Sequence, residues 1–443
     1  MRAGSGVLAT GIWGARLLGG VRVLVAGTGL VCLLGAAALS GGAPQGAVPA
    51  ALAQDGCAPR WTTAWHAAVQ PVPAEPDLAG RTLRMTVTPQ VTGTQVRIRV
   101  TNAFGATPLR IGAASVGRSV GAAGAEPGTL VPLTFAGGPA AVVLPGADLL
   151  SDPVPLAVRA GRALAVGLHL TEVPAVLARH AVALETSHLS GPGDATLDPA
   201  AAAFGTPVDW WSVLTGVDVL APRPVNAVVA VGDSITDGVG SAPGTGGRWT
   251  DALGRRLTAA GGPGAMAVLN AGISANHLVD GGTGDPPLAR FDRDVVRSGA
   301  TDVVLHIGTN DVAAGRSADE IVSGLVAFAD RARSAGTRLV LTTITPSTAG
   351  AHGSPDAVAV REAVNAWVRA HGAAHAAGVA DFAAAVADPA DPARLAPAFD
   401  SGDGLHLSAA GYRALADALD PALLTGSPCL AAPDPVRALA PAP

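Results

Sequence analysis

The hydrophobic pattern of this 443-residue chain changes its period near the Pro-containing segment 220–224. Before this segment, apolar and polar residues alternate in short runs such as 83–87 and 96–100, which is typical of half-buried antiparallel strands. Similar runs continue to about residue 215, with Gly, Pro, Asp and Ser between them. This half of the chain therefore predicts an antiparallel β-sandwich of jelly-roll type.

After the segment, apolar runs alternate with longer amphipathic stretches. The apolar runs predict buried parallel strands at 225–231, 267–270, 302–307 and 338–344. The amphipathic stretches predict helices at 249–260, 318–335, 355–371 and 408–419. Alternation of this kind predicts an α/β fold, in which helices cover a parallel sheet.

The same patterns set the expected domain organisation. We expect a signal peptide over residues 1–53, a β-sandwich domain over 54–220, an α/β domain over 221–425 and a C-terminal tail over 426–443. The leader has a basic start and an uncharged apolar run at 23–39, and small residues at 51–53 fit a cleavage site. These features predict a secreted, extracellular protein without stable membrane insertion after cleavage. An uncleaved membrane anchor is the alternative, although the apolar run is short for a spanning helix.

Composition excludes several functions. The chain has no lysine, so all 29 basic residues are Arg, which rules out Schiff-base chemistry and a phosphate-loop lysine. The leader holds three Arg and no acidic residue, so its removal changes the net charge from −5 to −8. A net negative chain is a poor partner for nucleic acid.

Two cysteines remain after the predicted cleavage, Cys57 and Cys429, near the two ends of the mature chain. In an oxidising compartment we expect them to form one disulfide. The alternative is two separate thiols.

Three candidate functional residues each follow a predicted strand. Ser234 comes after 225–231, Gly272 after 267–270 and Asn310 after 302–307. Because ligands bind beyond the carboxyl ends of parallel strands, the fold is expected to bring these residues together at one edge of the sheet.

Residue chemistry gives these positions roles in acyl transfer. A serine hydroxyl needs a general base within hydrogen-bond reach, and His406 is the candidate, with Asp403 as the carboxylate that orients it. The backbone N–H groups of Ser234 and Gly272 and the side-chain amide of Asn310 are the candidate donors to the oxyanion. No metal is expected, because His371 and His375 have helical spacing but no third ligand nearby.

These segments also carry a family resemblance. Gly-Asp-Ser at 232–234, the glycine block at Gly272, Gly-Thr-Asn-Asp at 308–311 and Asp-x-x-His at 403–406 resemble the four blocks of the SGNH (GDSL) hydrolase superfamily. The resemblance covers about residues 225–420. It implies a flavodoxin-like three-layer α/β/α domain with Ser234, Gly272, Asn310 and His406 as signature residues and Asp403 completing the triad. It also implies that no metal or organic cofactor takes part.

Thr-Asn-Ala-Phe-Gly at 101–105 and Ala-Arg-Phe-Asp-Arg-Asp at 289–294 resemble a secreted two-domain branch of this superfamily. That branch includes arylesterases and acylhydrolases linked to xylan degradation. The class of reaction is expected to transfer to this chain, whereas the substrate is not.

The sequence therefore predicts a secreted serine esterase that hydrolyses carboxylic esters through an acyl-enzyme on Ser234. Short acyl or acetyl esters, on small molecules or polysaccharide, are the expected substrates, and the oligomeric state is not predicted. A lipase- or phospholipase-type acylhydrolase is one alternative. A non-catalytic cell-surface binding protein on a hydrolase fold is another. The first domain has no Trp or Tyr between residues 66 and 209, which disfavours independent sugar binding.

Overall fold

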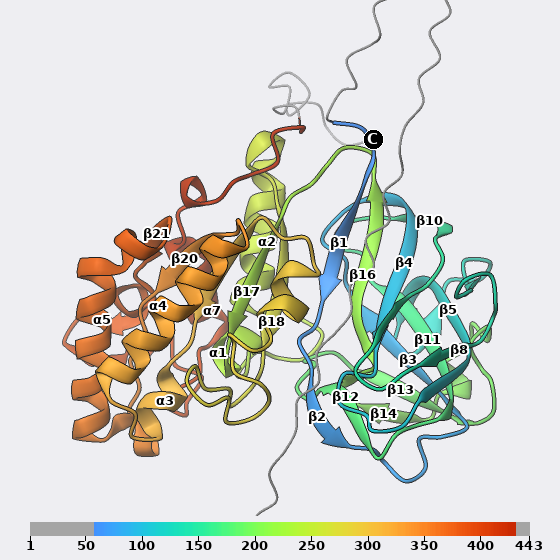
Figure 1. Cartoon of the computed structure of the whole chain (residues 1–443), viewed down its shortest axis with the longest axis horizontal. Helices are drawn as coiled ribbons and strands as arrows, with labels where there is room; N and C mark the ends of the chain where they lie inside the picture. The colour runs from blue at the N-terminus through green and yellow to red at the C-terminus, as the bar shows by residue number, and fades with distance from the viewer. Residues whose placement is uncertain (1–56, 431–443) are drawn as a thin grey trace, which may run out of the picture. The chain divides into compact units, whose positions relative to one another are not determined.

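A computed structural model describes residues 57–430 (Figure 1). The predicted signal peptide and the last part of the predicted tail lie outside the described residues. Strands β1 to β16 pair antiparallel throughout, whereas β17 to β21 are parallel and alternate with helices; a short antiparallel pair, β22 (Ala387–Asp388) and β23 (Asp391–Leu395), follows them.

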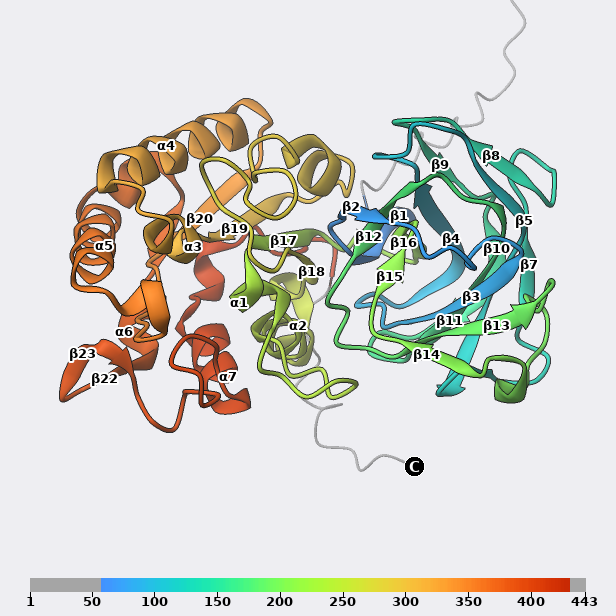
Figure 2. The same cartoon turned by 90° about the horizontal axis from the view of Figure 1, so that it is seen from below.

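The antiparallel strands form three sheets (Figure 2). The first has the order β1-β16-β4-β10, with β9 beside β4, and its strands are β1 (Arg60–His66), β16 (Leu214–Ala221), β4 (Gly93–Thr101), β10 (Val154–Val158) and β9 (Asp148–Leu150). The second has the order β14-β13-β3-β11-β5-β6, with β7 and β8 also paired to β5. Its strands are β14 (Thr206–Val208), β13 (Ser187–Pro192), β3 (Arg81–Val87), β11 (Leu164–Glu172), β5 (Leu109–Gly121), β6 (Gly124–Ala125), β7 (Val131–Leu133) and β8 (Ala141–Val143). The third contains β15 (Trp211–Ser212), β12 (Val176–His180) and β2 (Gln70–Pro73).

Every second residue is buried along several strands of this region, and these buried side chains lie in its core. In β10, buried Val154, Leu156 and Val158 alternate with exposed residues, and side chains from the first and second sheets share one hydrophobic core. The antiparallel β-sandwich predicted from the sequence is confirmed.

The α/β region is built on a five-stranded parallel sheet of order β18-β17-β19-β20-β21. The strands are β17 (Ala227–Gly232), β18 (Ala267–Gly272), β19 (Asp302–His306), β20 (Arg338–Thr342) and β21 (Gly378–Ala380). In sequence order this is 2-1-3-4-5, the flavodoxin-like arrangement, whose ligand site lies where the strand order reverses.

Helices lie on both faces of this sheet (Figures 1 and 2). They are α1 (Ser234–Asp237), α2 (Trp249–Ala260), α3 (Thr309–Ala313), α4 (Ala318–Ser334), α5 (Pro355–His375), α6 (Phe382–Val386) and α7 (Ala409–Ala418). Along β17, Val229 and Val231 join the core that contains α4 and α5, whereas Val228 and Ala230 join the core that contains α2 and α7. A strand buried on both faces explains the continuous apolar runs, and the predicted three-layer fold is confirmed.

Two elements differ from the sequence prediction for identifiable reasons. Strand β5 alternates in hydrophobicity only over residues 109–111 but extends to Gly121, because small residues without apolar alternation pair along β11. Strand β21 was missed because it has only three residues in an Ala-rich stretch without apolar contrast.

Cys57 and Cys429 form a disulfide with a Cα–Cα distance of 5.2 Å. The bond therefore joins the start of the described β-sandwich to the segment after the last helix. Between residues 57 and 430, we find no helix long and apolar enough to cross a membrane.

Candidate active site

An unbroken chain of hydrogen bonds joins Ser234, His406 and Asp403. The His406 Nε2 atom lies 2.9 Å from Ser234 Oγ, and His406 Nδ1 lies 2.6 Å from Asp403 Oδ2. If Nδ1–H donates to the carboxylate, the Nε2 lone pair is left to accept the serine hydroxyl proton. The structure thus brings together three residues that are up to 172 positions apart in sequence.

Asp403 is held by its own loop. Its Oδ1 atom accepts hydrogen bonds from the backbone N–H groups of Leu405, at 2.9 Å, and His406, at 2.8 Å. Burial raises the pKa of Asp403, but the bonds from the His406 side chain and from these two N–H groups outweigh it and lower the pKa to about 2. Asp403 is therefore ionised throughout the neutral range and able to orient His406.

Ser234 begins α1 directly after β17. Asp233 precedes it, and its Oδ1 accepts from the Ile235 N–H at 3.0 Å, so that this residue caps the short helix. Burial raises the pKa of Asp233 to about 7. This carboxyl supports the turn that presents Ser234 and makes no bond to His406.

Asn310 lies on α3, after the central strand β19. Its Nδ2 donates to the backbone carbonyl of Asn276 at 3.0 Å. The next residue, Asp311, accepts the N–H groups of Leu278, at 2.7 Å, and Val279, at 2.9 Å. Asn310 is thereby placed against the segment 273–276, the loop that follows β18, which we call the β18 loop.

The surroundings of Gly272 favour a packing role over the oxyanion role predicted from the sequence. Its N–H donates to Asn270 Oδ1 at 2.8 Å and so is not available to an oxyanion. A Cβ atom at Gly272 would lie 2.2 Å from the backbone nitrogen of Asp237. This glycine is therefore needed for the close approach of β18 to α1, a packing role that the sequence alone did not separate from catalysis.

The β18 loop contains another backbone N–H, that of Ala275, which has no acceptor among the described residues. The Asn276 N–H bonds the Ile273 carbonyl at 3.1 Å, which makes 273–276 a β-turn, and Ala275 at its third position has a φ of 60°. A positive φ there defines a type II turn, a place that favours glycine. Within residues 57–430 no acceptor is found for the Ala275 N–H. A strained non-glycine residue with a spare donor, next to Asn310, is typical of a functional site.

His352 is a second unpredicted neighbour of the site. It lies on the short helix η4 (Gly350–Gly353), with its Nε2 atom 3.3 Å from Asn310 Oδ1. Burial and the nearby His406 lower the pKa of His352, so it is neutral at neutral pH. If the Nε2–H of the neutral His352 ring donates to Asn310 Oδ1, the NH2 group of Asn310 points away from His352.

The residues that the sequence prediction missed carry no residue-type signal. Alanine at 275 is one of many in an Ala-rich chain, and its importance comes only from its backbone angle. His352 lies in a segment with no strand or helix pattern. The pair His371 and His375, considered above as metal ligands, both pack on Trp367 in α5. The described residues contain no group of His, Cys, Asp or Glu able to hold a metal ion.

A 2-1-3-4-5 parallel sheet with a Ser-His-Asp hydrogen-bonded chain at its carboxyl edge defines a flavodoxin-like α/β protein with the site of a serine hydrolase. Residues 230–414 match the GDSL-like lipase/acylhydrolase family. This match agrees with the resemblance of residues 225–420 to the SGNH (GDSL) hydrolase superfamily and supports a carboxylic ester hydrolase.

Solved structures with similarity to part of the chain carry related names. A lipase/acylhydrolase from Enterococcus faecalis has 25% identity, covering 44% of this chain and 93% of its own, with a TM-score of 0.36. A GDSL-like lipase from Bacteroides thetaiotaomicron has 21% identity, with coverages of 45% and 90% and a TM-score of 0.34. A mutant acetyl-xylooligosaccharide esterase from Geobacillus Stearmophilus has 24% identity, with coverages of 44% and 91% and a TM-score of 0.34. The curated proteins gave no match to the sequence.

Proposed function

We propose that the chain is a secreted serine esterase that acts through an acyl-enzyme on Ser234. The observation that carries this proposal is the chain of contacts from Ser234 Oγ to His406 Nε2, 2.9 Å, and from His406 Nδ1 to Asp403 Oδ2, 2.6 Å. These distances are those a general base and its orienting carboxylate need.

In the first half-reaction, Ser234 Oγ forms a bond to the ester carbonyl carbon while its proton passes to His406 Nε2. The tetrahedral intermediate collapses by breaking the bond to the alcohol oxygen, which takes the proton from Nε2 and leaves. Water then loses a proton to Nε2 and attacks the acyl-Ser234 ester. The serine oxygen recovers the proton as the carboxylic acid departs.

The oxyanion would be met by the N–H of Ser234, the N–H of Ala275 and the side-chain amide of Asn310. The amide of Asn310 has two donor hydrogens, and only one is used by the Asn276 carbonyl. Ala275 takes the place that the sequence prediction gave to Gly272, whose N–H is bonded to Asn270. Loss of one such donor typically costs about 10²–10³-fold in kcat.

Short acyl esters on an accessible alcohol, polysaccharide esters included, fit this site best. The Asp403 side chain is 50% exposed and that of His406 is 16% exposed, whereas Ser234 is buried at 6%, so the triad runs from the surface to a buried nucleophile. Three cavities of about 510, 910 and 690 Å³ lie on the described part of the chain, and Ser234 lines none of them. A long acyl chain needs apolar wall to cover it, whereas an acetyl group does not. An acylhydrolase of the lipase or phospholipase type is the second candidate.

Secretion is supported by the Cys57–Cys429 disulfide, which persists in oxidising compartments. A leader at residues 1–53 would direct this export. Comparison of the N-terminal sequence of the exported protein with the full chain tests the proposal; a mature protein that begins near residue 54 supports it, and one that retains the leader contradicts it.

The catalytic proposal is tested by hydrolysis of p-nitrophenyl esters from acetate to palmitate. We expect wild type to prefer acetate, and Ser234→Ala to lose about 10³-fold or more in kcat. The exposed serine variant Ser334→Ala is the matched control and should equal wild type. Equal rates for Ser234→Ala and wild type would refute the proposal, and a preference for palmitate would favour the lipase candidate.

A further inference from the structure

Two histidines of the β-sandwich contact buried carboxylates of the α/β domain. His180, at the end of β12, has its Nε2 atom 3.0 Å from Asp237 Oδ1. His66, at the end of β1, has its Nε2 atom 3.5 Å from Asp294 Oδ1. All four side chains are at least nine-tenths buried.

Both ring nitrogens of His180 face oxygen acceptors. Nδ1 lies 2.8 Å from the Ala68 carbonyl, and Nε2 lies 3.0 Å from the Val182 carbonyl as well as from Asp237. His180 is therefore held between a backbone carbonyl on each side of its ring. The ring also stacks on Trp211, with centroids 5.3 Å apart, which fixes its orientation.

The other oxygen of Asp237 holds the β18 loop. Asp237 Oδ2 accepts the Ser274 N–H at 3.1 Å and the Ser274 hydroxyl at 2.6 Å. No hydrogen bond to Asp237 Oδ1 is found among the described residues, so the contact of this oxygen with His180 Nε2 is a close approach without hydrogen-bond geometry. His180 therefore faces the second oxygen of the carboxylate that fixes Ser274, the residue before Ala275.

The second carboxylate reaches the same loop through an arginine. Asp294 Oδ2 binds Arg290 Nη1 at 2.8 Å, and Arg290 Nη2 donates to Asn276 Oδ1 at 3.1 Å. Arg290 also binds the carbonyls of Ala271, at 2.7 Å, and Gly232, at 3.1 Å, at the ends of β18 and β17. Burial raises the pKa of Asp294, but His66, Arg290 and Arg293 together hold it below its ordinary value.

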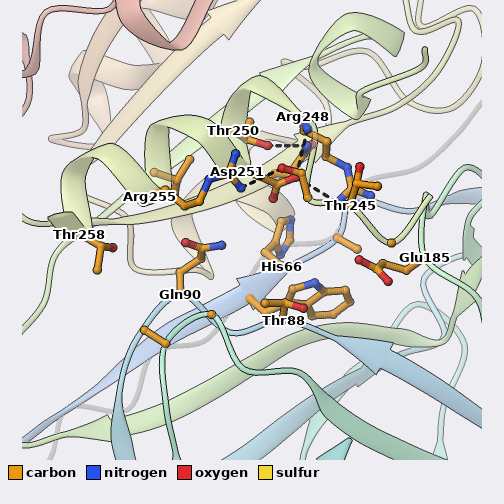
Figure 3. A pocket seen from close by; sticks show the side chains of 18 of the residues that line it. His66, Thr88, Gln90, Glu185, Thr245, Arg248, Thr250, Asp251, Arg255 and Thr258 are labelled. Atoms are coloured by element: carbon orange, nitrogen blue, oxygen red, sulfur yellow. Dashed lines mark hydrogen bonds and ion pairs between the residues drawn. The ribbon is translucent and has the colours of Figure 1, made fainter. Parts of the chain in front are cut away.

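The contact between the β-sandwich and the α/β domain contains a cavity. A cavity of about 510 Å³ lies between β1 and α2, and the side chains around it include His66, Gln90, Glu185, Arg248 and Asp251 (Figure 3). Side-chain packing does not fill this place, so the His–Asp contacts add to the positioning of the two domains here.

We propose that His180 and His66 are positioning residues for the oxyanion donors, so that the β-sandwich helps to set the geometry of the catalytic site. This inference rests on the proposed function. One His–Asp pair is connected to the β18 loop through Ser274 and the other through Arg290 and Asn276, and the Asn276 carbonyl in turn holds Asn310. A displacement of this loop moves two proposed donors together, although neither histidine touches the substrate.

Three variants test the proposal: His180→Ala, His66→Ala and, as the matched control, His169→Ala, a partly buried histidine of β11 that faces no α/β residue. Amide hydrogen exchange of the peptide covering 273–276 is the first measurement, because it does not depend on any assumed reaction. We expect exchange to become about tenfold faster or more in both interface variants and to stay unchanged in the control. Unchanged exchange in both interface variants would overturn the proposal even if Ser234 proves to be the nucleophile.

Kinetics separate positioning from simple loss of stability. We expect kcat for p-nitrophenyl acetate to fall about 10–100-fold in His180→Ala with KM nearly unchanged. Because His180 acts through Asp237 on Ser274, the double variant His180→Ala/Ser274→Ala should be little slower than the slower single variant. Multiplied effects in the double variant, or a loss confined to KM, would contradict the proposal. Should His180→Ala fail to fold, His180→Gln, which keeps one donor, is measured in the same cycle and should lose less.

Discussion

At the scale of single residues, Ala275 shows how strain and function coincide. A non-glycine residue at the third position of a type II turn costs about 1–2 kcal/mol. The hydrogen bonds that Ser274 donates to Asp237 and that Arg290 donates to Asn276 maintain this turn. The backbone N–H that this conformation exposes is the one we assign to the oxyanion. The side chain at 275 contributes nothing to this chemistry.

Ala275→Gly should therefore stabilise the protein without loss of activity. Relief of the left-handed strain exceeds the roughly 0.4–1 kcal/mol that glycine adds to the entropy of the unfolded chain. We expect the free energy of unfolding, measured with a denaturant, to rise by about 0.5–1 kcal/mol and kcat to stay within about twofold. Ala314→Gly, at a φ of −79°, is the control and should destabilise. A lower stability for Ala275→Gly would show that the turn is not strained.

At the scale of elements, each catalytic candidate follows the carboxyl end of a strand or a short turn. Apolar runs flanked by glycine predicted where β17, β18 and β19 lie in the sequence. The positions of Ser234 and Asn310 followed from these strands. The sequence does not separate two roles near the end of β18. Close packing belongs to Gly272, whereas the spare hydrogen-bond donor belongs to Ala275, three residues later. Only the turn geometry distinguishes them, and turn geometry depends on Asp237 and Arg290, which are distant in sequence.

The central strand β19 carries a buried histidine with a pH-dependent effect on stability. Burial lowers the pKa of His306 to about 4, whereas the unfolded side chain titrates near its ordinary value of about 6.5. The folded state is therefore neutral at 306 while the unfolded state binds a proton. Its contribution is fully present above pH 6.5 and is lost as the pH falls toward 4.

We expect the free energy of unfolding to fall between pH 6.5 and 4, with His306 contributing on the order of 3 kcal/mol to the change. The His306→Gln variant, which keeps a polar partner for Thr342 Oγ1 at 2.8 Å in wild type, should lose most of this slope. Denaturant titrations of both proteins across this pH range provide the measurement. Parallel pH profiles for the two proteins would contradict the assignment.

At the scale of the whole molecule, the change of hydrophobic period predicted both domain types, because periods of 2 and 3.6 follow from backbone geometry. The way the β-sandwich serves the site could not be predicted. It depends on histidines at strand ends meeting carboxylates more than 50 residues away, a contact that no local pattern encodes.

The disulfide acts at this same scale, since it closes a loop with a sequence separation of 372 residues. Reduction should lower the free energy of unfolding by about 2–5 kcal/mol, mainly because the unfolded chain gains freedom. The active site is expected to survive, since neither cysteine touches it. Thermal unfolding and esterase assays with and without reductant, beside the Cys57→Ser/Cys429→Ser variant, test this. An unchanged Tm on reduction would show that the bond adds no stability.

The central claim is that Ser234 is the nucleophile, and covalent labelling tests it most directly. Wild-type protein is treated with a fluorophosphonate, which reacts with activated serines, and digested for mass spectrometry. We predict a single phosphonyl adduct on the peptide containing Ser234, loss of esterase activity in proportion to labelling, and no adduct in Ser234→Ala. An active protein that stays unlabelled at Ser234, or that carries its inactivating adduct on another residue, would contradict the account.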